Sequence, residues 1–341
     1  MRALRYLMAY SIPVTVAISF LSEGWLSFLP LIYGFGVVPL LDQVVGPKSG
    51  NLTEVEHQSE SENKLYDAVI YTVVPVQLAM LIWFLWEVQN PMATSDLVGR
   101  ITAMGMMCGV LGINVAHELG HRPKSFERAM AKILLGTSLY MHFYIEHNKG
   151  HHRNVGTSVD GATARRNEML YFFWIRTIIQ SFKSAWQITA KELGRKKLRV
   201  WSRHNELLRM LAIQLALCAA IGFVFSWTVL GYFVCAAGMG ILLLETVNYI
   251  EHYGLYRNKV SEFRYEDVEP RHSWNSDHVL GRLVLFELTR HSDHHYEPAK
   301  HYQLLDSMNG ASQLPAGYPA MMLLSMFPPV WFRVMHPRLP A

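Results

Sequence analysis

Six stretches of largely apolar residues occupy most of the first 250 positions of the chain, and they limit the folds available to it. A helix needs about 20 such residues to cross a bilayer, and lipid offers an exposed backbone no hydrogen-bond partner. The sequence therefore predicts an all-α integral membrane protein with six transmembrane helices. We expect these helices at about residues 3–22, 24–41, 67–88, 96–117, 207–228 and 229–250.

The composition agrees with a membrane protein. Hydrophobic residues make up 51% of the chain and charged residues 17%, against roughly 25% charged residues in an average soluble domain. No linker or repeat divides the sequence, so residues 1–341 are predicted to form a single membrane-embedded domain. The first apolar run follows Arg2 and Arg5 and has no evident cleavage site, so we expect a retained anchor. The polar stretch 50–64 is predicted to be a surface loop.

The basic residues predict the orientation of the helices. About half of all lysines and arginines lie between Arg122 and Arg203, whereas three short links between apolar runs carry none. Positive residues stay on the cytoplasmic side. We therefore expect both termini in the cytoplasm, together with a cap formed by residues 118–206 and 251–341. The short apolar run 129–145 carries Lys132 and His142, and we expect it not to cross the membrane.

The 16 histidines are unusual because most of them are clustered. Three groups have spacings that bring imidazoles onto one face of a helix, while neighbouring histidines point about 100° apart and could serve two different metals. A further histidine ends the last apolar run. All of them fall on the predicted cytoplasmic side. The candidate ligands are His117, His121, His147, His151, His152, His252, His291, His294 and His295.

These histidines allow more than one interpretation. His117-Glu118-Leu119-Gly120-His121 alone matches the H-E-x-x-H pattern of zinc proteases, with Glu118 as general base. A catalytic zinc uses three protein ligands and water, so nine histidines favour two metals. Imidazole binds iron, zinc, copper and nickel; redox chemistry on a hydrophobic substrate would indicate iron. A non-catalytic metal or haem carrier is a third alternative.

The other histidines are expected not to be ligands. Four lie near the groups in sequence and could be their hydrogen-bond partners: His142, His272, His278 and His301. Three more are predicted to be surface residues: His57, His204 and His336. The acidic neighbours of the candidate ligands could orient their imidazole N–H groups. These neighbours are Glu118, Glu146, Glu251 and Asp293.

The groups resemble the three histidine boxes of the membrane fatty-acid desaturase and hydroxylase superfamily. The segments around them resemble the bacterial alkane 1-monooxygenases more closely. These segments are FYIEHNKGHHR (143–153), NYIEHYGL (248–255), HSWNS (272–276), LTRHSDHH (288–295) and LPAGYP (314–319). The resemblance extends from about residue 30 to residue 335.

This resemblance implies a six-helix bundle in the bacterial inner membrane, with a cytoplasmic histidine-rich cap that holds two iron ions on the nine histidines. It implies terminal hydroxylation of medium- to long-chain n-alkanes with dioxygen. The electrons would come from a separate rubredoxin and an NAD(P)H-dependent rubredoxin reductase, because the chain lacks rubredoxin cysteines. The net charge of +4 does not indicate nucleic acid. Related hydroxylases that act on xylene, toluene or fatty acyl chains are the alternative.

The resemblance also suggests a route for the substrate. We expect a channel from the bilayer among the first four spans, with Gly34 at the position where a bulky residue would limit chain length. The alternative role of Gly34 is close helix packing. Glu245, an ionisable residue in the sixth span, is either functional or a paired structural acid. Without a bridging carboxylate, the two irons should lie farther apart than in carboxylate-bridged sites. The basic segment 191–203 could dock an acidic rubredoxin or face anionic lipid.

Overall fold

The computed structural model describes residues 2–262 and 264–340, and it is almost entirely helical. Six helices are long and apolar enough to cross a membrane, as the apolar runs predict. They are Arg2–Leu21, Gly24–Val45, Leu65–Glu87, Thr94–His121, Glu206–Val224 and Trp227–His252. The predicted boundaries differ from these by up to four residues. The second and fourth helices continue past the predicted apolar run, whereas the fifth ends at Val224, before its predicted end.

Several of these helices change their winding along their length. The first joins a 3₁₀ segment η1 (Arg2–Tyr10) to α1 (Ser11–Leu21). The second runs through η2 (Gly24–Phe28), α2 (Leu29–Ile32), a π-helical η3 (Tyr33–Val37) and α3 (Val38–Val45). The fourth comprises α6 (Thr94–Met106), π-helical η4 (Met107–Ile113) and α7 (Asn114–His121). π turns inside α-helices often mark functional sites.

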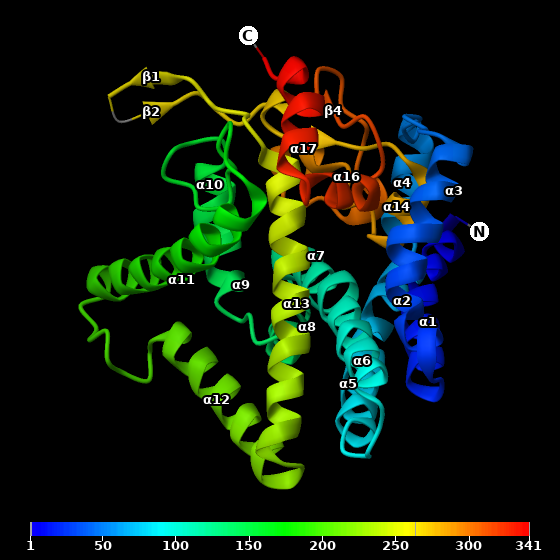
Figure 1. Ribbon diagram of the computed structural model, residues 1–341. Helices are drawn as coiled ribbons and strands as arrows, with labels where there is room; N and C mark the ends of the chain where they lie inside the picture. The colour runs from blue at the N-terminus through cyan, green and yellow to red at the C-terminus, as the bar shows by residue number, and fades with distance from the viewer. Residues whose placement is uncertain (1, 263, 341) are drawn as a thin grey trace.

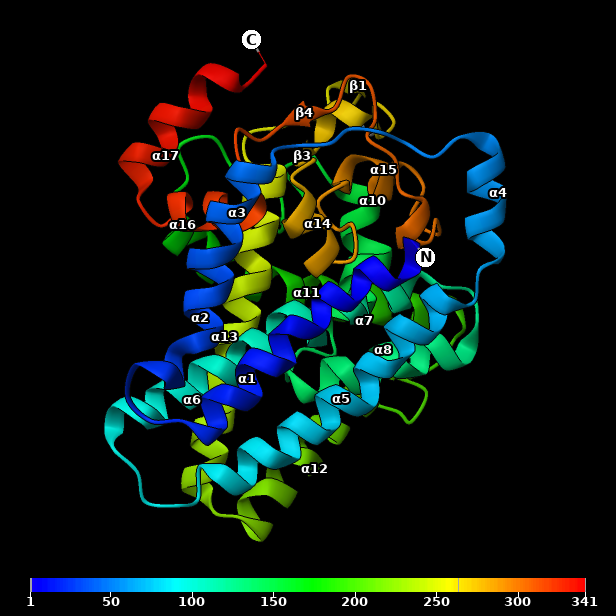
Figure 2. The same ribbon diagram turned by 90° about the vertical axis from the view of Figure 1, so that its right-hand side faces the viewer.

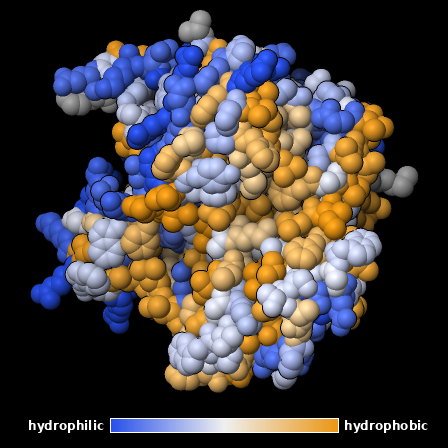
Figure 3. Space-filling view, in the orientation of Figure 1, coloured by the Kyte–Doolittle hydropathy of each residue, from blue (hydrophilic) through white to orange (hydrophobic). Residues whose placement is uncertain are grey.

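The remaining spans are continuous. The third is α5 (Leu65–Glu87), the fifth α12 (Glu206–Val224) and the sixth α13 (Trp227–His252). In Figure 1, α13 runs through the molecule from the cap to the far end, and the first four spans lie on one side of it. The hydrophobic colour in Figure 3 spreads over the long helices, whereas the hydrophilic colour gathers over the cap and its hairpin.

The cap is built from two parts of the chain. Residues between the fourth and fifth spans form α8 (Ser125–Thr137), α9 (Phe143–Glu146), η5 (His147–His151), α10 (His152–Asn154) and the long α11 (Leu170–Arg195). The run 129–145 therefore breaks into short helices, and no spanning helix is found there among the described residues. The long helix α11 was not predicted. It has an amphipathic sequence, and in Figure 1 it lies to one side of α13 and runs outward from it.

The part of the chain after α13 completes the cap. Its helices are η6 (Pro270–His272), α14 (Val279–Val284), α15 (His291–Tyr296), η7 (Tyr302–Leu304), α16 (Tyr318–Ser325), α17 (Pro328–Met335) and η8 (His336–Arg338). A hairpin pairs β1 (Lys259–Ser261) with β2 (Arg264–Tyr265), and β3 (Trp274–Asn275) lies parallel to β4 (Ser312–Gln313). Figure 2 shows α14 and α15 beside the N-terminus.

The predicted loop 50–64 is partly wrong. Residues Glu54–Glu62 form a helix, α4, which buries none of its side chains. A capping box starts it: the Thr53 hydroxyl accepts a hydrogen bond from the backbone N–H of Glu56, whose carboxylate accepts one from the Thr53 N–H. Two acidic residues in the first turn also favour this helix terminus. The stretch has no apolar period because the helix buries none of its side chains, so hydrophobic patterning could not reveal it.

Buried ion pairs hold the cap against the spans. Arg122, directly after α7, is almost fully buried and pairs with Asp67 of α5 and with Glu118 and Glu127. Asp42 of α3 accepts hydrogen bonds from the backbone N–H groups of Leu280 (2.7 Å) and Gly281 (3.0 Å) at the start of α14. These contacts fix the ends of the spans relative to the cap helices that carry the histidines.

Candidate metal centre

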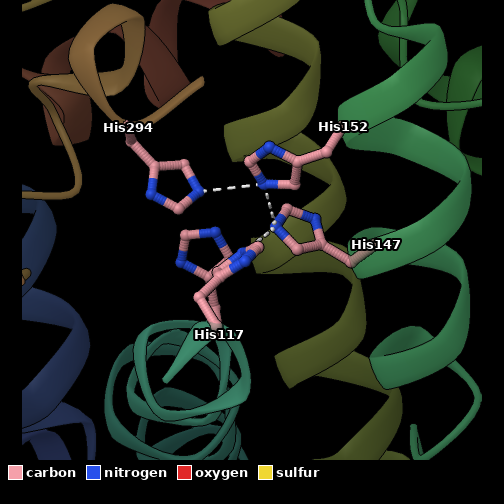
Figure 4. A group of neighbouring side chains, drawn as sticks. His117, His147, His152 and His294 are labelled. Carbon is pink, nitrogen blue, oxygen red and sulfur yellow. Dashed lines mark hydrogen bonds between the residues drawn. The ribbon is translucent and has the colours of Figure 1, made fainter. Parts of the chain in front are cut away.

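Five histidines converge into a first cluster at the junction of the fourth span and the cap. Their ligand nitrogens all lie within 4.8 Å of one another. The Nε2 of His147 is 3.0 Å from that of His121 and 3.0 Å from that of His152, and His152 Nε2 is 3.1 Å from His294 Nε2. His117 completes the group, and Figure 4 shows rings from α7, η5, α10 and α15 pointing toward one another.

Four further histidines form a second cluster, and all four are buried. The Nε2 of His291 is 3.1 Å from that of His252 and 2.9 Å from that of His295, and His295 Nε2 is 3.2 Å from His151 Nε2. The two clusters together contain all nine predicted ligand candidates. No other histidine of the described residues joins either group.

The local helix geometry decides which histidine joins which cluster. On α7, His117 and His121 are four residues apart and share a cluster, as α-helical spacing requires. Along η5 the π turn carries one more residue per turn. His147 and His152, five apart, therefore share the first cluster, and His151 joins the second. The expectation that neighbouring histidines would serve two positions holds for both adjacent pairs: His151 with His152, and His294 with His295.

The clusters have the donor set and the spacing of metal sites. Metal–imidazole bonds of about 2.0–2.1 Å place neighbouring nitrogens about 3 Å apart when the bonds are near right angles. The Nε2 separations of 2.9–3.2 Å match that value. Burial lowers the pKa of His294 and of His295 well below 6.5, so their imidazoles are neutral and have a free lone pair. His117 Nε2 is buried without a hydrogen-bond partner.

A carboxylate that the sequence did not indicate supports the second cluster. Asp160 Oδ2 lies 3.0 Å from His151 Nδ1 and accepts a hydrogen bond from the Thr163 hydroxyl at 2.6 Å. Burial opposes the ionisation of Asp160, but the adjacent His151 outweighs it and lowers the pKa of the carboxyl. Such a partner fixes the ring and makes Nε2 a better ligand. Asp160 stands in a loop eight residues beyond His152, with no periodic relation to the ligands.

The acidic neighbours named from the sequence mostly have other partners. Glu118 accepts hydrogen bonds from the Arg122 guanidinium at 3.0–3.1 Å. Asp293 binds the ammonium group of Lys300 at 2.8 Å. Among the described residues, both carboxylates are thus engaged by cationic side chains, and their role as orienting groups stays a prediction.

Glu251, another of those acidic neighbours, contacts a histidine of the second cluster. Its Oε2 lies 3.2 Å from His291 Nε2, while its Oε1 is buried without a hydrogen-bond partner. Glu251 lies outside both groups of converging ligand atoms, which consist of histidines alone. The distance between the two metals, and the absence of a bridging carboxylate, remain predictions.

An apolar cavity adjoins this part of the molecule. It is lined by Ile12, Gly34, Phe35, Val38, Met106, Gly109, Val110, Asn114, Leu243, Leu244, Val247, Gly281, Val284, Leu285, Leu288, Pro319 and Met322. Asn114 is three residues before His117, and Leu288 is three before His291. We expected a channel among the first four spans. The wall of this cavity differs from that expectation, because the sixth span contributes residues to it and the third does not.

Gly34 lies on the wall of this cavity. A Cβ atom at Gly34 would come within 2.7 Å of the Met106 side chain, whereas one at Gly36 would meet nothing within 4 Å. Gly34, which the family resemblance placed on the substrate route, is therefore a lining residue of the apolar cavity. Its role in selecting chain length remains a prediction.

The comparisons with known proteins agree with these observations. A family model described as fatty acid desaturase matches residues 97–325. The alkane 1-monooxygenase of Ectopseudomonas oleovorans is 41% identical over 319 residues, covering 92% of this chain and 79% of the relative. Alkane 1-monooxygenase 1 of Alcanivorax borkumensis is 40% identical over 313 residues, covering 91% and 77%. The chain belongs to the fatty acid desaturase family and, among its members, to the alkane 1-monooxygenases.

A more distant relative has a different name. The hydroxylase component of the xylene/toluene monooxygenase of Pseudomonas putida is 30% identical over 248 residues, which are 72% of this chain and 64% of the relative. The resemblance inferred from the histidine boxes is confirmed. The zinc-protease interpretation is disfavoured, because Glu118 is bound by Arg122 and accepts a hydrogen bond from the Tyr302 N–H at 3.3 Å.

The remaining polar candidates have structural partners. Glu245 is buried and accepts hydrogen bonds from the Tyr140 hydroxyl (2.7 Å), the Thr177 hydroxyl (3.0 Å) and the Asn248 amide (3.1 Å). The interpretation of Glu245 as a paired structural acid therefore fits this alkane 1-monooxygenase. His336, expected to be a surface residue, is half-buried, and its Nε2 lies 2.9 Å from the Tyr253 hydroxyl.

Proposed function

We propose that the protein hydroxylates the terminal methyl group of medium- to long-chain n-alkanes to give 1-alkanols. Dioxygen is the co-substrate, and reduced rubredoxin supplies the electrons. The observation that carries this proposal is the pair of buried all-histidine clusters beside a cavity whose walls carry no charged side chain. Seven relatives named alkane 1-monooxygenase, 35–41% identical to this chain, support the substrate class.

We propose two iron ions as the cofactor, one in each cluster of histidines. His117, His121, His147, His152 and His294 would hold the first, and His151, His252, His291 and His295 the second. Imidazole nitrogen suits iron as well as zinc or copper, so the choice of iron rests on the redox reaction. Bound iron would supply the reductive activation of dioxygen that an unreactive C–H bond requires.

The protein's own residues bind and position the substrate. Methyl, methylene and aromatic side chains line the cavity and favour an alkane over water. Its single polar side chain, Asn114, is already used, because its amide donates a hydrogen bond to the carbonyl oxygen of Leu285 at 3.0 Å. The amide N–H₂ of Asn114 therefore needs no hydrogen bond from a bound n-alkane. Exclusion of water also protects the reaction centre from side reactions.

A membrane location follows from the same features. We propose that residues 1–341 form one domain in the bacterial inner membrane, with both termini and the clusters in the cytoplasm. The positive-inside rule supports this orientation. The amphipathic helix α11 exposes a stripe of apolar side chains, as a helix lying on a membrane surface does. These are Tyr171, Phe172, Ile175, Ile179 and Phe182.

A groove near the clusters suits the proposed electron donor. Lys149 and Arg153, on the segment that carries His147–His152, line it together with Lys191 and Arg195 of α11. Glu192 is the acidic residue in its lining, and it pairs with Lys149 at 2.8 Å. The groove is therefore positive overall and would attract an acidic protein. A separate rubredoxin, reduced by an NAD(P)H-dependent reductase, is the proposed partner.

The first experiment combines metal analysis with a substrate panel on detergent-purified protein. Octane, dodecane, hexadecane, p-xylene and lauric acid are each supplied with rubredoxin, its reductase and NADH. We expect about two irons per chain and 1-alkanols as the main products. Products from p-xylene alone would favour the alternative suggested by the xylene/toluene relative. One zinc per chain without oxygen consumption would contradict the oxidative chemistry.

The substitution Gly34→Leu tests whether the apolar cavity holds the substrate. The new side chain would project against Met106, so we expect the ratio of hexadecane to octane products to fall about tenfold. The matched control is Gly36→Leu, two residues away on the same helix, where the added side chain meets nothing. An unchanged product profile for Gly34→Leu would remove the cavity from the proposal.

A further inference from the structure

A second pocket, of about 580 Å³, lies where the first span meets the cap. Its walls come from the start of η1, the segment 48–52 after α3, one face of α14, and the chain around η7. It is distinct from the apolar cavity. Gly281, Val284 and Leu285 of α14 line that cavity, whereas Arg282 and Leu283 line this pocket.

The pocket is strongly basic. Its lining includes Arg2, Arg5, Lys48, Arg282 and Arg290. A single acidic residue, Glu287, faces them. The Tyr6 hydroxyl donates a hydrogen bond to Glu287 at 2.8 Å, and the Arg282 guanidinium pairs with it at 2.6 Å. Glu287 is therefore already neutralised by groups of the wall.

Two of these cations have no carboxylate partner. Arg2 pairs with Glu56 at 2.6 Å. Within residues 2–262 and 264–340, Arg5 and Lys48 form no ion pair. Both are exposed residues at the rim. Two unpaired positive charges at the opening favour an anion as the occupant.

The floor of the pocket contains buried polar groups that lack partners. Arg290 is only 4% exposed, and its terminal nitrogens bond to the carbonyl oxygens of Leu305 and Gly50. Its Nε has no acceptor within hydrogen-bond distance, and the Asp277 and Glu287 carboxylates lie 3.6 Å from it. The Gln303 side chain is 8% exposed, and its amide oxygen has no partner. Buried polar groups in folded proteins are almost always hydrogen-bonded. An oxyanion in the pocket would give Arg290 Nε an acceptor.

The position of the pocket indicates how such an anion would be presented. Leu4 and Leu7, on either side of Arg5 in η1, are 51% and 49% exposed at the cap end of a membrane span. Leu52, Val279, Leu283 and Leu305 add apolar surface to the lining. Apolar side chains below and cations above match a phospholipid, whose phosphate lies directly above its acyl chains.

We propose that this pocket binds the phosphate group of an anionic glycerophospholipid from the surrounding leaflet. Its acyl chains lie along Leu4 and Leu7, and its phosphate lies among Arg5, Lys48 and Arg282. A free phosphate anion has the same charge chemistry, but it would gain nothing from the apolar surface beside the cations.

Native mass spectrometry of the full chain tests the proposal. Protein exchanged into detergent with equal amounts of phosphatidylglycerol and phosphatidylcholine is released in the gas phase, and retained lipids are counted. Wild-type protein should retain phosphatidylglycerol preferentially. The double variant Arg5→Gln/Lys48→Gln should lose about tenfold of this preference, while Lys259→Gln/Arg264→Gln, on the exposed β1–β2 hairpin, should keep it.

Three outcomes would overturn the proposal. Equal lipid preference in wild type and the Arg5/Lys48 variant would show that the pocket is not used. The same loss in the hairpin variant would show a non-specific effect of charge. Displacement of phosphatidylglycerol by millimolar inorganic phosphate would identify a soluble anion as the occupant. If the double variant unfolds at a lower temperature than wild type, Arg5→Gln and Lys48→Gln are measured singly, and each should lose part of the preference.

Discussion

The two histidine clusters are built from the same ligand type, yet they differ in access and in charge. The first has five histidines, two of which, His121 and His152, are only partly buried. The second has four, all buried, and two carboxylates lie against it: Asp160 at His151 and Glu251 at His291. Partners around the ligands tune a bound metal as much as the ligands do. The comparison indicates two chemically inequivalent positions, one of them more open and one enclosed beside two carboxyl groups.

Removal of a ligand from each cluster should give the largest effect. In His294→Ala we expect the first position to lose its metal, and in His291→Ala the second. Metal content should fall from about two ions per chain to about one, and 1-alkanol formation should fall at least about a thousandfold in both. Metal analysis and product analysis of the same preparations provide the measurement. His204→Ala, at an exposed histidine, is the control, and loss of both metals in a single variant would contradict two separate positions.

Replacement of Asp160 should distinguish the clusters from each other. Asp160→Asn keeps the size of the side chain but removes the charge that supports His151. We expect metal affinity at the second cluster to fall about 10–100-fold, with the first cluster unaffected. A chelator titration that follows each of the two metals should show one weakened and one unchanged step. Asp267→Asn, at an exposed carboxylate, should behave as wild type; equal weakening of both steps in Asp160→Asn would refute the selective role.

The basic groove should affect electron delivery without affecting the clusters. In Lys191→Gln/Arg195→Gln we expect the KM for rubredoxin to rise about fivefold, with kcat retained, because these charges attract an acidic partner. The difference from wild type should shrink as salt is added. Lys64→Gln, at an exposed lysine outside the groove, is the matched control. An unchanged KM at low salt would place the docking surface elsewhere.

The smallest expected effect is on the stability of metal-free protein. Burial lowers the pKa of five cluster histidines outside the spans: His147, His152, His291, His294 and His295. His151 differs, because Asp160 outweighs the effect of burial and raises its pKa. Below pH 6.5 these histidines bind protons in the unfolded chain but stay neutral in the folded protein. The free energy of unfolding therefore decreases as the pH is lowered. His151 acts in the opposite direction but is outnumbered.

Thermal unfolding in detergent measures this dependence. We expect the melting temperature of metal-free protein to fall by about 5 °C between pH 7.5 and 5.5. In Asp160→Asn, His151 loses the charge that raises its pKa, so the fall should be steeper. A melting temperature that rises as pH falls would show that the clusters are protonated in the folded state.

The membrane architecture was largely predictable because it depends on length and hydropathy along the chain. All six spans occur close to their predicted positions, since a bilayer tolerates little else over 20 residues. Helix α4 was missed because it has no buried face. Helix α11 was missed because its apolar residues recur at helical spacing among charged and polar ones, so its sequence contains no continuous apolar run like those of the spans.

The composition of the candidate site was also predictable, and its arrangement was not. All nine histidines come together, because i, i+4 spacing and a common membrane side leave few alternatives. Asp160 and Glu251 contact histidines from a loop and from a neighbouring helix, and no spacing rule connects these residues to His151 and His291.

By itself the sequence determined the class of the protein. It predicts six membrane spans and nine histidines that can bind metal on one side of the membrane. The tertiary structure decided how the donors divide. The π turn of η5 places His147 and His152 in one cluster and His151 in the other, and α15 places His294 in the first and His291 and His295 in the second. That division depends on local winding and on how distant helices pack. On α15 the i, i+4 spacing of His291 and His295 agrees with the division, whereas on η5 spacing alone does not give it, because one extra residue per turn changes which side of the helix each imidazole faces.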